Sequence, residues 1–220
     1  MLSEKLTFLD CFCGLGGVSD GFAAEGFEIL GIEYNKEVSK EYPYDCIVAD
    51  VRTLNGKMFK GFDVIWGSPP CRDFSQIGLL YGKRWKNPPN PENGIKTIKC
   101  FMKFVEDAQP KIWIMENVAN LKKYFTEIKP RTEGYITYGK KHVFYGNYPL
   151  FLMSRDMRIK IRCKNKNGRD QPNMKYLQPA SHNNRVIQSR QHARIPLVCS
   201  QAFARACKRK LLEDSSTVNS

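Results

Sequence analysis

Short apolar runs alternate with polar or helix-forming stretches along the first half of the chain. Five runs have the length and composition of buried strands: LTFL at 6–9, EILGIEY at 28–34, CIVAD at 46–50, FDVIW at 62–66 and KIWIMENV at 111–118. Between the last two, apolar residues recur at helical spacing over 94–108. This alternation of strands and helices predicts a doubly wound α/β fold with a parallel sheet.

The second half of the chain has a weaker pattern. We expect a long loop at 76–93, a helix at 119–129 and one or two strands within YITYGKKHVFYGNYPLF, with a further strand at 156–162. The end is clearer, because Pro196 precedes a helical pattern that runs to about Leu212. The polar tail at 213–220 is predicted to be disordered.

Charge is divided unevenly between the two parts of the chain. Residues 1–120 hold 14 Lys and Arg against 16 Asp and Glu, whereas residues 121–220 hold 21 against 6. So many unbalanced cations repel one another unless an anionic partner relieves them. Nucleic acid is therefore favoured as a partner over an acidic membrane surface.

Composition argues against several other classes of protein. The eight cysteines are scattered and only three histidines are present, so neither a disulfide framework nor a metal site is expected. No apolar run approaches the roughly 20 residues that span a bilayer, and the N-terminus does not have a leader pattern. The expectation is a cytoplasmic protein of one main domain, with reduced thiols.

Polar groups and glycines follow three of the predicted strands. Gly14, Gly16 and Gly17 come directly after the first strand, where a tight turn lets backbone N–H groups approach a ligand. Glu33 ends the second strand, a position from which a carboxylate can accept hydrogen bonds from a ribose, and Asp50 ends the third. Because parallel strands end at one edge of a sheet, these groups are expected to converge.

The fourth and fifth strands lead into the most distinctive segments, GSPPCRDFS at 67–75 and Glu116-Asn117. Two prolines stiffen the backbone before Cys71, which suits a nucleophile that must meet one carbon atom. A small buried thiol is the plain alternative. Glu116 lies at the edge of a buried strand, where desolvation favours a protonated carboxyl and hence a proton donor.

In this order and at these spacings, DCFCGLGG, Glu33, Asp50, GSPPCRDFS and ENV resemble the DNA cytosine-5 methyltransferase family, over roughly residues 6–150. The small size resembles members from phages or mobile elements. The resemblance implies a Rossmann-like methyltransferase fold, S-adenosylmethionine as cofactor, and a flipped cytosine in double-stranded DNA as substrate. It implies that Cys71 adds to ring carbon 6, that Glu116 donates to ring nitrogen 3 and that Asn117 orients the loop.

The resemblance also implies a cofactor site. Its residues are Asp10, Phe12, Cys13, Gly14, Leu15, Gly16, Gly17, Glu33, Tyr34, Asp50, Val51 and Pro69. The chain departs from the family at Arg72, where a glutamine is usual, and in lacking the Gln-x-Arg-x-Arg strand, for which Lys140-Lys141-His142 is the nearest match. Nucleic-acid contacts are expected from Ser75, Lys140, Lys141, His142, Arg158, Lys160 and Arg162.

The expected organisation is a catalytic core at 1–146, a reduced basic recognition region at 147–194, and a helix at 195–212 that packs back on the core of a monomer. Two alternatives stay open. One is an RNA cytosine-5 methyltransferase of the same fold, and the other is a non-catalytic DNA-binding protein on a methyltransferase scaffold.

Overall fold

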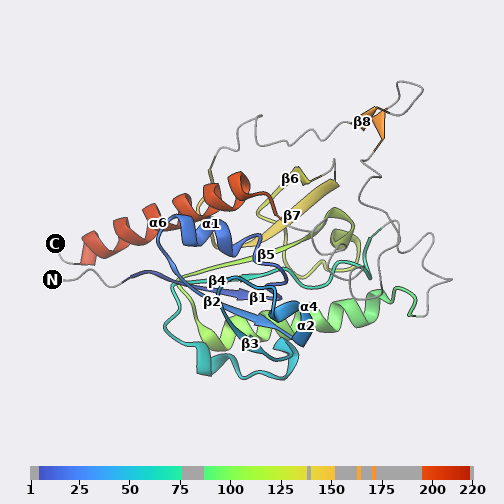
Figure 1. The fold of residues 1–220 in the computed structure, drawn as a ribbon, viewed down its shortest axis with the longest axis horizontal. Coiled ribbons are helices and arrows are strands. Elements are labelled where there is room, and N and C mark those ends of the chain that lie inside the picture. Colours follow the sequence, from blue (N-terminus) through green and yellow to red (C-terminus); the bar gives the residue numbers. More distant parts are fainter. Residues whose placement is uncertain are drawn as a thin grey trace.

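A seven-stranded sheet forms the centre of the molecule (Figure 1). The computed structural model describes residues 5–75, 87–137, 140–151, 163–164, 170–171 and 195–218. The strand expected at 156–162 therefore lies outside the described residues. Of the recognition region expected at 147–194, the structure describes only 147–151 and the two-residue strands β8 (Cys163–Lys164) and β9 (Asp170–Gln171). No helix among the described residues is long and apolar enough to cross a membrane.

The sheet has the strand order β3-β2-β1-β4-β5-β7-β6. Its strands are β1 (Thr7–Cys11), β2 (Glu28–Glu33), β3 (Asp45–Val48), β4 (Val64–Gly67), β5 (Ile112–Val118), β6 (Thr132–Thr137) and β7 (Lys140–Gly146). The first five are parallel, and β7 runs antiparallel between β5 and β6. The predicted doubly wound α/β class is confirmed, and the segment after residue 131 forms two strands.

The direction of winding reverses between β1 and β4. From β1 the chain moves outward through β2 to β3, and it then returns to place β4 on the other side of β1. Ligands of open α/β sheets bind beyond the carboxyl ends of the strands at such a reversal. The glycine turn follows β1 and the Pro-Pro-Cys segment follows β4, so both lie at this point, where Ser68 N–H donates to the Cys11 carbonyl at 3.3 Å.

Helices cover both faces of the sheet (Figure 1). On one face α1 (Ser19–Ala24) and α6 (Leu197–Val218) pack together so closely at Gly21 that a Cβ there would clash with Ser200. Phe203 of α6 inserts among aromatic side chains of the sheet, with its ring centroid 5.1 Å from that of Trp66. The predicted packing of the C-terminal helix on the core is thus present in the structure.

On the other face lies α4 (Pro91–Ala108), with the 3₁₀ helices η1 (Val51–Thr53) and η2 (Gly56–Phe59) beside it. The side chain of Asn90 caps α4 by accepting from the N–H groups of Glu92 and Asn93, at 3.0 and 3.3 Å. With Pro91 in the first turn, this cap starts the helix three residues before the predicted position, within the segment predicted as loop. The short helix α2 (Lys36–Ser39) links β2 to β3.

The helix predicted at 119–129 is wrong beyond its first turn. A 3₁₀ helix, η4, spans Ala119–Lys123, and the chain is then irregular as far as β6. Pro130 disfavours helical geometry at the residue before it, and the buried ring of Phe125 packs toward Tyr145 of β7 instead of continuing a helical face.

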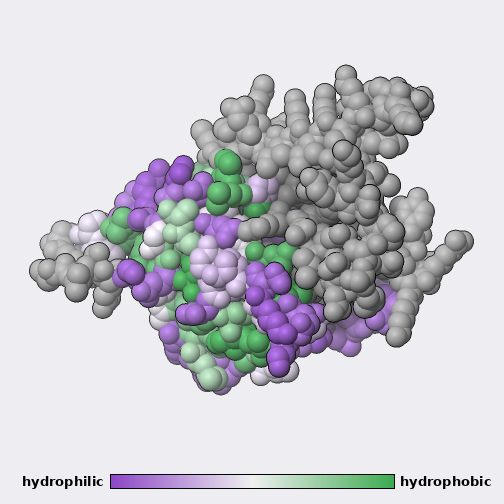
Figure 2. Space-filling model, viewed as in Figure 1, coloured by the Kyte–Doolittle hydropathy of each residue, from purple (hydrophilic) through white to green (hydrophobic). Residues whose placement is uncertain are grey.

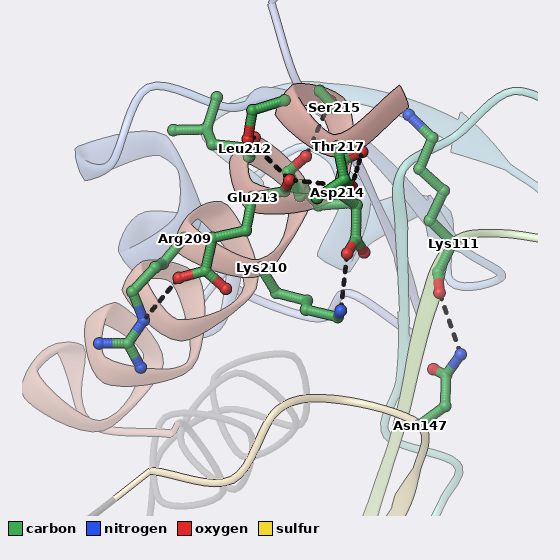
Figure 3. Close-up of polar contacts among 11 residues, drawn as sticks. Lys111, Asn147, Arg209, Lys210, Leu212, Glu213, Asp214, Ser215 and Thr217 are labelled. Atoms are coloured by element: carbon green, nitrogen blue, oxygen red, sulfur yellow. Dashed lines mark hydrogen bonds and ion pairs between the residues drawn. The ribbon is translucent and has the colours of Figure 1, made fainter. Parts of the chain in front are cut away.

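The helix α6 is longer than predicted, because it continues to Val218 through the tail expected to be disordered. Hydroxyl groups in its last turns donate to carbonyls one turn earlier, for example from Ser215 to Leu211 at 2.8 Å. Lys210 also pairs with Asp214 one turn later at 2.6 Å, beside the exposed pair of Arg209 and Glu213 (Figure 3). The outward side of α6 is largely hydrophilic (Figure 2).

Candidate active site

The glycine turn after β1 depends on left-handed backbone conformations. Phe12, Gly14 and Gly16 have φ angles of 64°, 55° and 76°. A Cβ on Gly16 would lie 3.0 Å from the ring of Pro43, so the turn needs glycine there for space as well as for conformation. The half-buried ring of Phe12 contacts Phe101 edge to face. The turn is therefore held in one shape by the core beneath it.

Glu33 joins the glycine turn to the end of β2. Its carboxylate accepts from the backbone N–H of Gly14 at 3.2 Å and from that of Asn35 at 3.0 Å, and it is 1% exposed. Its backbone carbonyl accepts from Ala49 N–H at 3.1 Å, which brings the segment leading to Asp50 alongside. The ends of β1, β2 and β3 therefore lie next to one another.

Asp10 lies beneath this turn and is 2% exposed. The Ser19 hydroxyl donates to it at 2.6 Å, and the same hydroxyl contacts Tyr42 Oη at 2.7 Å. Burial raises the pKa of Asp10 to about 7, against the opposing effect of the Ser19 hydrogen bond, and the charge of Glu33 adds to the rise. The sequence reasoning missed this network, since nothing in the spacing relates Ser19 or Tyr42 to Asp10.

Asp50 is engaged by a neighbour that the sequence reasoning did not consider. Arg52 Nε lies 2.9 Å from its Oδ2, and the Arg52 backbone N–H donates to its Oδ1 at 3.0 Å. These bonds lower the pKa of Asp50. Next to it Val51 is buried, whereas Tyr34 after β2 is 63% exposed.

The cofactor residues of the glycine turn differ in exposure. Cys13 is buried with its Sγ 3.9 Å from that of Cys46, and burial raises its pKa. Leu15 and Gly14 are half-buried, and Gly17 is buried. For all the predicted cofactor residues, contact with the cofactor itself stays a prediction.

One side chain from β5 and one from η4 hold the Pro-Pro-Cys segment in place. Asn117 Nδ2 donates to the carbonyl of Pro69 at 3.0 Å, and Asn120 Nδ2 donates to that of Phe74 at 2.8 Å. The carbonyl of Cys71 closes a turn by accepting from the N–H groups of Phe74 and Ser75, both at 3.0 Å. Cys71 itself is half-buried. Asn117 thus contacts the loop that it was predicted to orient.

Glu116 is paired with His142 across β5 and β7. The Nδ1 of His142 lies 2.5 Å from Oε1 of Glu116, and the two side chains are 8% and 12% exposed. His142 was predicted to contact nucleic acid as a cation near the surface. The structure instead shows the side chain buried and paired with a carboxylate, and contact with nucleic acid stays a prediction.

The adjacent residue Lys141 points to the opposite face of β7. It pairs with Glu133 at 2.7 Å, and Glu133 also binds Lys122 at 2.6 Å. The side chain of Lys140 and the predicted contacts at 158–162 lie outside the described residues. Groups of three or more possible metal ligands are absent from the part of the chain that the structure describes.

The match to a known family falls on this half of the molecule. A family model for the C-5 cytosine-specific DNA methylase matches residues 6–130, which hold the glycine turn, Glu33, Cys71 and Glu116. The chain belongs to this methylase family.

Relatives of this methylase chain are mostly longer proteins. It is 30% identical over 178 residues to the Type II methyltransferase M1.HphI of Haemophilus parahaemolyticus, covering 76% of the chain and 42% of the relative. It is 33% identical over 126 residues to M.DdeI of Desulfomicrobium norvegicum, covering 53% of the chain and 28% of the relative. The chain thus spans less than half the length of these relatives.

Among solved structures, the methylase chain is similar to a prophage-encoded E. coli protein described as a candidate DNA modification methyltransferase. The TM-score is 0.46 at 22% identity, and the match covers 64% of this chain and 46% of the other.

The groups at the ends of β1, β2 and β3 fit the cofactor that this methylase family implies. A buried carboxylate on Glu33 suits the two hydroxyls of a ribose, and Asp50 offers an acceptor to an amino group. The glycine turn presents backbone without side chains. These carboxylate acceptors and the backbone of the glycine turn therefore match the polar parts of S-adenosylmethionine.

Proposed function

We propose that this chain is a DNA cytosine-5 methyltransferase that transfers a methyl group from S-adenosylmethionine to ring carbon 5 of a flipped cytosine. The observation that carries the proposal is the bond from Asn117 to the Pro69 carbonyl at 3.0 Å. It ties the backbone two residues before Cys71 to the residue next to Glu116. A nucleophile and a proton donor are thereby fixed on neighbouring strands of one sheet.

The register of β4 and β5 supports this arrangement. Gly67 pairs with Met115, so Cys71 and Glu116 both lie near the carboxyl edge of the sheet where its winding reverses. The two flanking loops cannot move independently, because Asn117 and Asn120 each bond the Pro-Pro-Cys segment. Fixed separation of two reacting groups is what positions a base between them.

Ring carbon 5 of cytosine is too weak a nucleophile to take a methyl group while the ring is aromatic. The Cys71 thiolate adds to ring carbon 6, and its electron pair forms the new C–S bond. The ring electrons displaced toward nitrogen 3 are neutralised by a proton from Glu116, so that carbon 5 becomes enamine-like. After methylation, water takes the carbon-5 proton, the C–S bond breaks to release the Cys71 thiolate, and nitrogen 3 returns its proton to Glu116, so that the ring regains its aromaticity.

S-adenosylmethionine supplies the electrophilic methyl group when it is bound. In this proposal Glu33 holds the ribose, Asp50 lies near the adenine, and Phe12 with the turn from Gly14 to Gly17 receives the remainder. The target must leave the duplex, since a stacked base cannot meet Cys71. The excess of cations after residue 120 supports duplex DNA as the substrate. Two further points stay predictions, that the chain works inside the cell and that it works as a monomer. Sedimentation with and without DNA tests the second.

Base-resolution sequencing of DNA from cells that express the chain tests the proposal. We expect 5-methylcytosine at a defined motif with the wild type and none with Cys71→Ser. Cys100→Ser is the matched control, because Cys100 is an equally half-buried thiol on α4 outside the Pro-Pro-Cys segment, and it should methylate like the wild type.

Three results would contradict the proposal. Equal methylation by Cys71→Ser would remove the nucleophile assignment. Methylation of transfer RNA but not of duplex DNA, when both are offered in competition, would move the substrate to RNA. If the folded protein binds S-adenosylmethionine but methylates neither transfer RNA nor duplex DNA, the remaining interpretation is a non-catalytic DNA-binding protein on the same scaffold.

A further inference from the structure

Glu116 and His142 lie on the sheet face that α6 covers. In the register of β5 and β7, Glu116 is opposite Phe144 and His142 is opposite Val118, so the pair is diagonal across two antiparallel strands. Diagonal neighbours on one face are within reach of long side chains. The contact from Nδ1 to Oε1 is therefore built into the register of the strands.

The separation of 2.5 Å requires a proton between the two atoms. An imidazole nitrogen and a carboxylate oxygen that both present lone pairs repel each other, whereas charge-assisted N–H to O contacts are about 2.7–2.9 Å long. The proton lies on Nδ1 of His142 if the carboxyl is ionised, or on Glu116 if Nδ1 accepts. The pair carries an acidic proton as imidazolium with carboxylate or as imidazole with carboxylic acid, and it carries none when a neutral imidazole donates from Nδ1 to a carboxylate.

The groups that face this pair are mostly apolar. Ile114 and Phe144 belong to the same buried cluster on this face, and Gly134 of β6 lies opposite His142 without a side chain. From α6 the thiol of Cys199 is near, since burial and then the charge of Glu116 raise its pKa to about 12. The charged cluster of Lys141, Glu133 and Lys122 lies on the opposite face.

We propose that His142 is a positioning residue for Glu116 and that the pair stores the proton that Glu116 delivers to the cytosine. The inference rests on the proposed function. When the Cys71 sulfur bonds carbon 6, the shared proton moves through Glu116 to ring nitrogen 3 and leaves a carboxylate beside a neutral imidazole. When Cys71 is expelled, the ring returns that proton to the pair, so the balance of charge closes.

A histidine does here what an arginine in the family's Gln-x-Arg-x-Arg strand cannot do. A guanidinium keeps its protons at all relevant pH values, so a carboxyl beside it must carry the reactive proton alone. Imidazole gives up and regains a proton readily, and two coupled groups exchange it as one unit.

Nuclear magnetic resonance of the histidine side chains tests the pair without turnover. The chain has three histidines, and the signals absent from His142→Asn identify those of His142. We expect Glu116→Gln to move the Nδ1 signal of His142 and to leave the other two histidines unchanged. Glu133→Gln is the matched control, because Glu133 lies on the adjacent strand but faces the other side of the sheet. A His142 signal that ignores Glu116→Gln overturns the proposal.

Methylation kinetics test what the pair does. In His142→Asn the amide Nδ2 takes the place of Nδ1 and can donate, but it does not exchange its protons. We expect kcat at pH 8 to fall roughly 10- to 100-fold, with the alkaline limb of the pH profile moved to lower pH and KM for DNA little changed. Glu133→Gln should keep the wild-type profile, because Glu133 lies on the opposite face of the sheet. The same profile in His142→Asn as in the wild type, or a change confined to KM for DNA in both variants, would overturn the role.

The two levels of inference fail separately. A wild type that methylates no DNA ends the proposed function. The resonance experiment still decides whether Glu116 and His142 share a proton. A wild type that methylates DNA while His142→Asn and His142→Arg retain its pH profile ends only the inference about His142.

Discussion

Two glutamates near the ends of parallel strands, the buried Glu33 and the half-buried Glu116, are held in different ways. Glu33 receives backbone N–H groups from Gly14 and Asn35, which cannot change their protonation. Glu116 meets the imidazole of His142, which can. The first arrangement fixes a carboxylate as an acceptor, and the second allows a carboxyl to gain and lose a proton. In our proposal, the two glutamates become a binding group and a proton donor because their hydrogen-bond partners differ.

Glu116→Gln breaks the second arrangement and should have the largest effect. An amide fills the same space but has no acidic proton to give, so we expect kcat to fall about 100- to 10,000-fold. Single-turnover methylation of duplex DNA measures the loss, and calorimetry should give an unchanged Kd for S-adenosylmethionine. A variant with near wild-type kcat would show that Glu116 does not supply the proton.

Glu33→Gln breaks the first arrangement, and its effect should appear in binding instead. The NH₂ group of the new amide would replace one of the two oxygens that accept from the backbone N–H groups of Gly14 and Asn35, so that two donors would face each other. The negative charge that faces the ribose would also be lost. We expect S-adenosylmethionine to bind roughly 10- to 100-fold more weakly, in line with the worth of a hydrogen bond to a charged group. Titration calorimetry measures this Kd. If kcat at saturating cofactor fell as far as in Glu116→Gln, the division between the two carboxylates would be wrong.

Asp10 extends the comparison to a third carboxyl, which is buried and bears on stability. Its pKa of about 7 in the folded chain exceeds the ordinary value of 3.8 because of burial. The folded state therefore keeps a proton that the unfolded state releases above about pH 4. The resulting stabilisation is complete below pH 4, declines as the pH rises toward 7 and is absent above it.

Asp10→Asn removes this titration while keeping an acceptor for Ser19. Between pH 5 and pH 8 the free energy of unfolding of the wild type should fall by about 3 kcal/mol relative to that of the variant. Urea unfolding of both proteins at the two pH values measures the difference, and contributions from other groups cancel in the comparison. A difference that stays constant with pH would place the Asp10 pKa near its ordinary value.

The sequence predicted the sheet, the order of its parallel strands along the chain and the edge where the site residues meet, because these follow from apolar periodicity and from chain direction. It did not predict the partners of those residues. The contact of His142 with Glu116 depends on the register of β7, and the capture of Asp50 by Arg52 depends on side-chain rotamers. Local patterns also misjudged the end of α6, where the contacts from Lys210 to Asp214 and from Ser215 to Leu211 extend the helix through a polar tail.

Arg52→Ala should have the smallest effect of the series, and it tests whether Asp50 resembles Glu33 in being held by backbone. Arg52 is 55% exposed at its side chain, and exposed ion pairs contribute about 0 to 1 kcal/mol. The cap that Asp50 makes with the backbone N–H of residue 52 survives the substitution, since alanine keeps that N–H. We therefore expect little change in urea unfolding.

The same substitution should strengthen binding of S-adenosylmethionine by a few-fold. Asp50 would no longer have to break its ion pair with Arg52 before it bonds the adenine. Asp50→Ala is the matched variant, and it should lose both the cap, at about 1 kcal/mol of stability, and cofactor affinity. Should Arg52→Ala instead weaken the binding measured by calorimetry, the guanidinium would itself be a cofactor contact, and Asp50 would serve to position it.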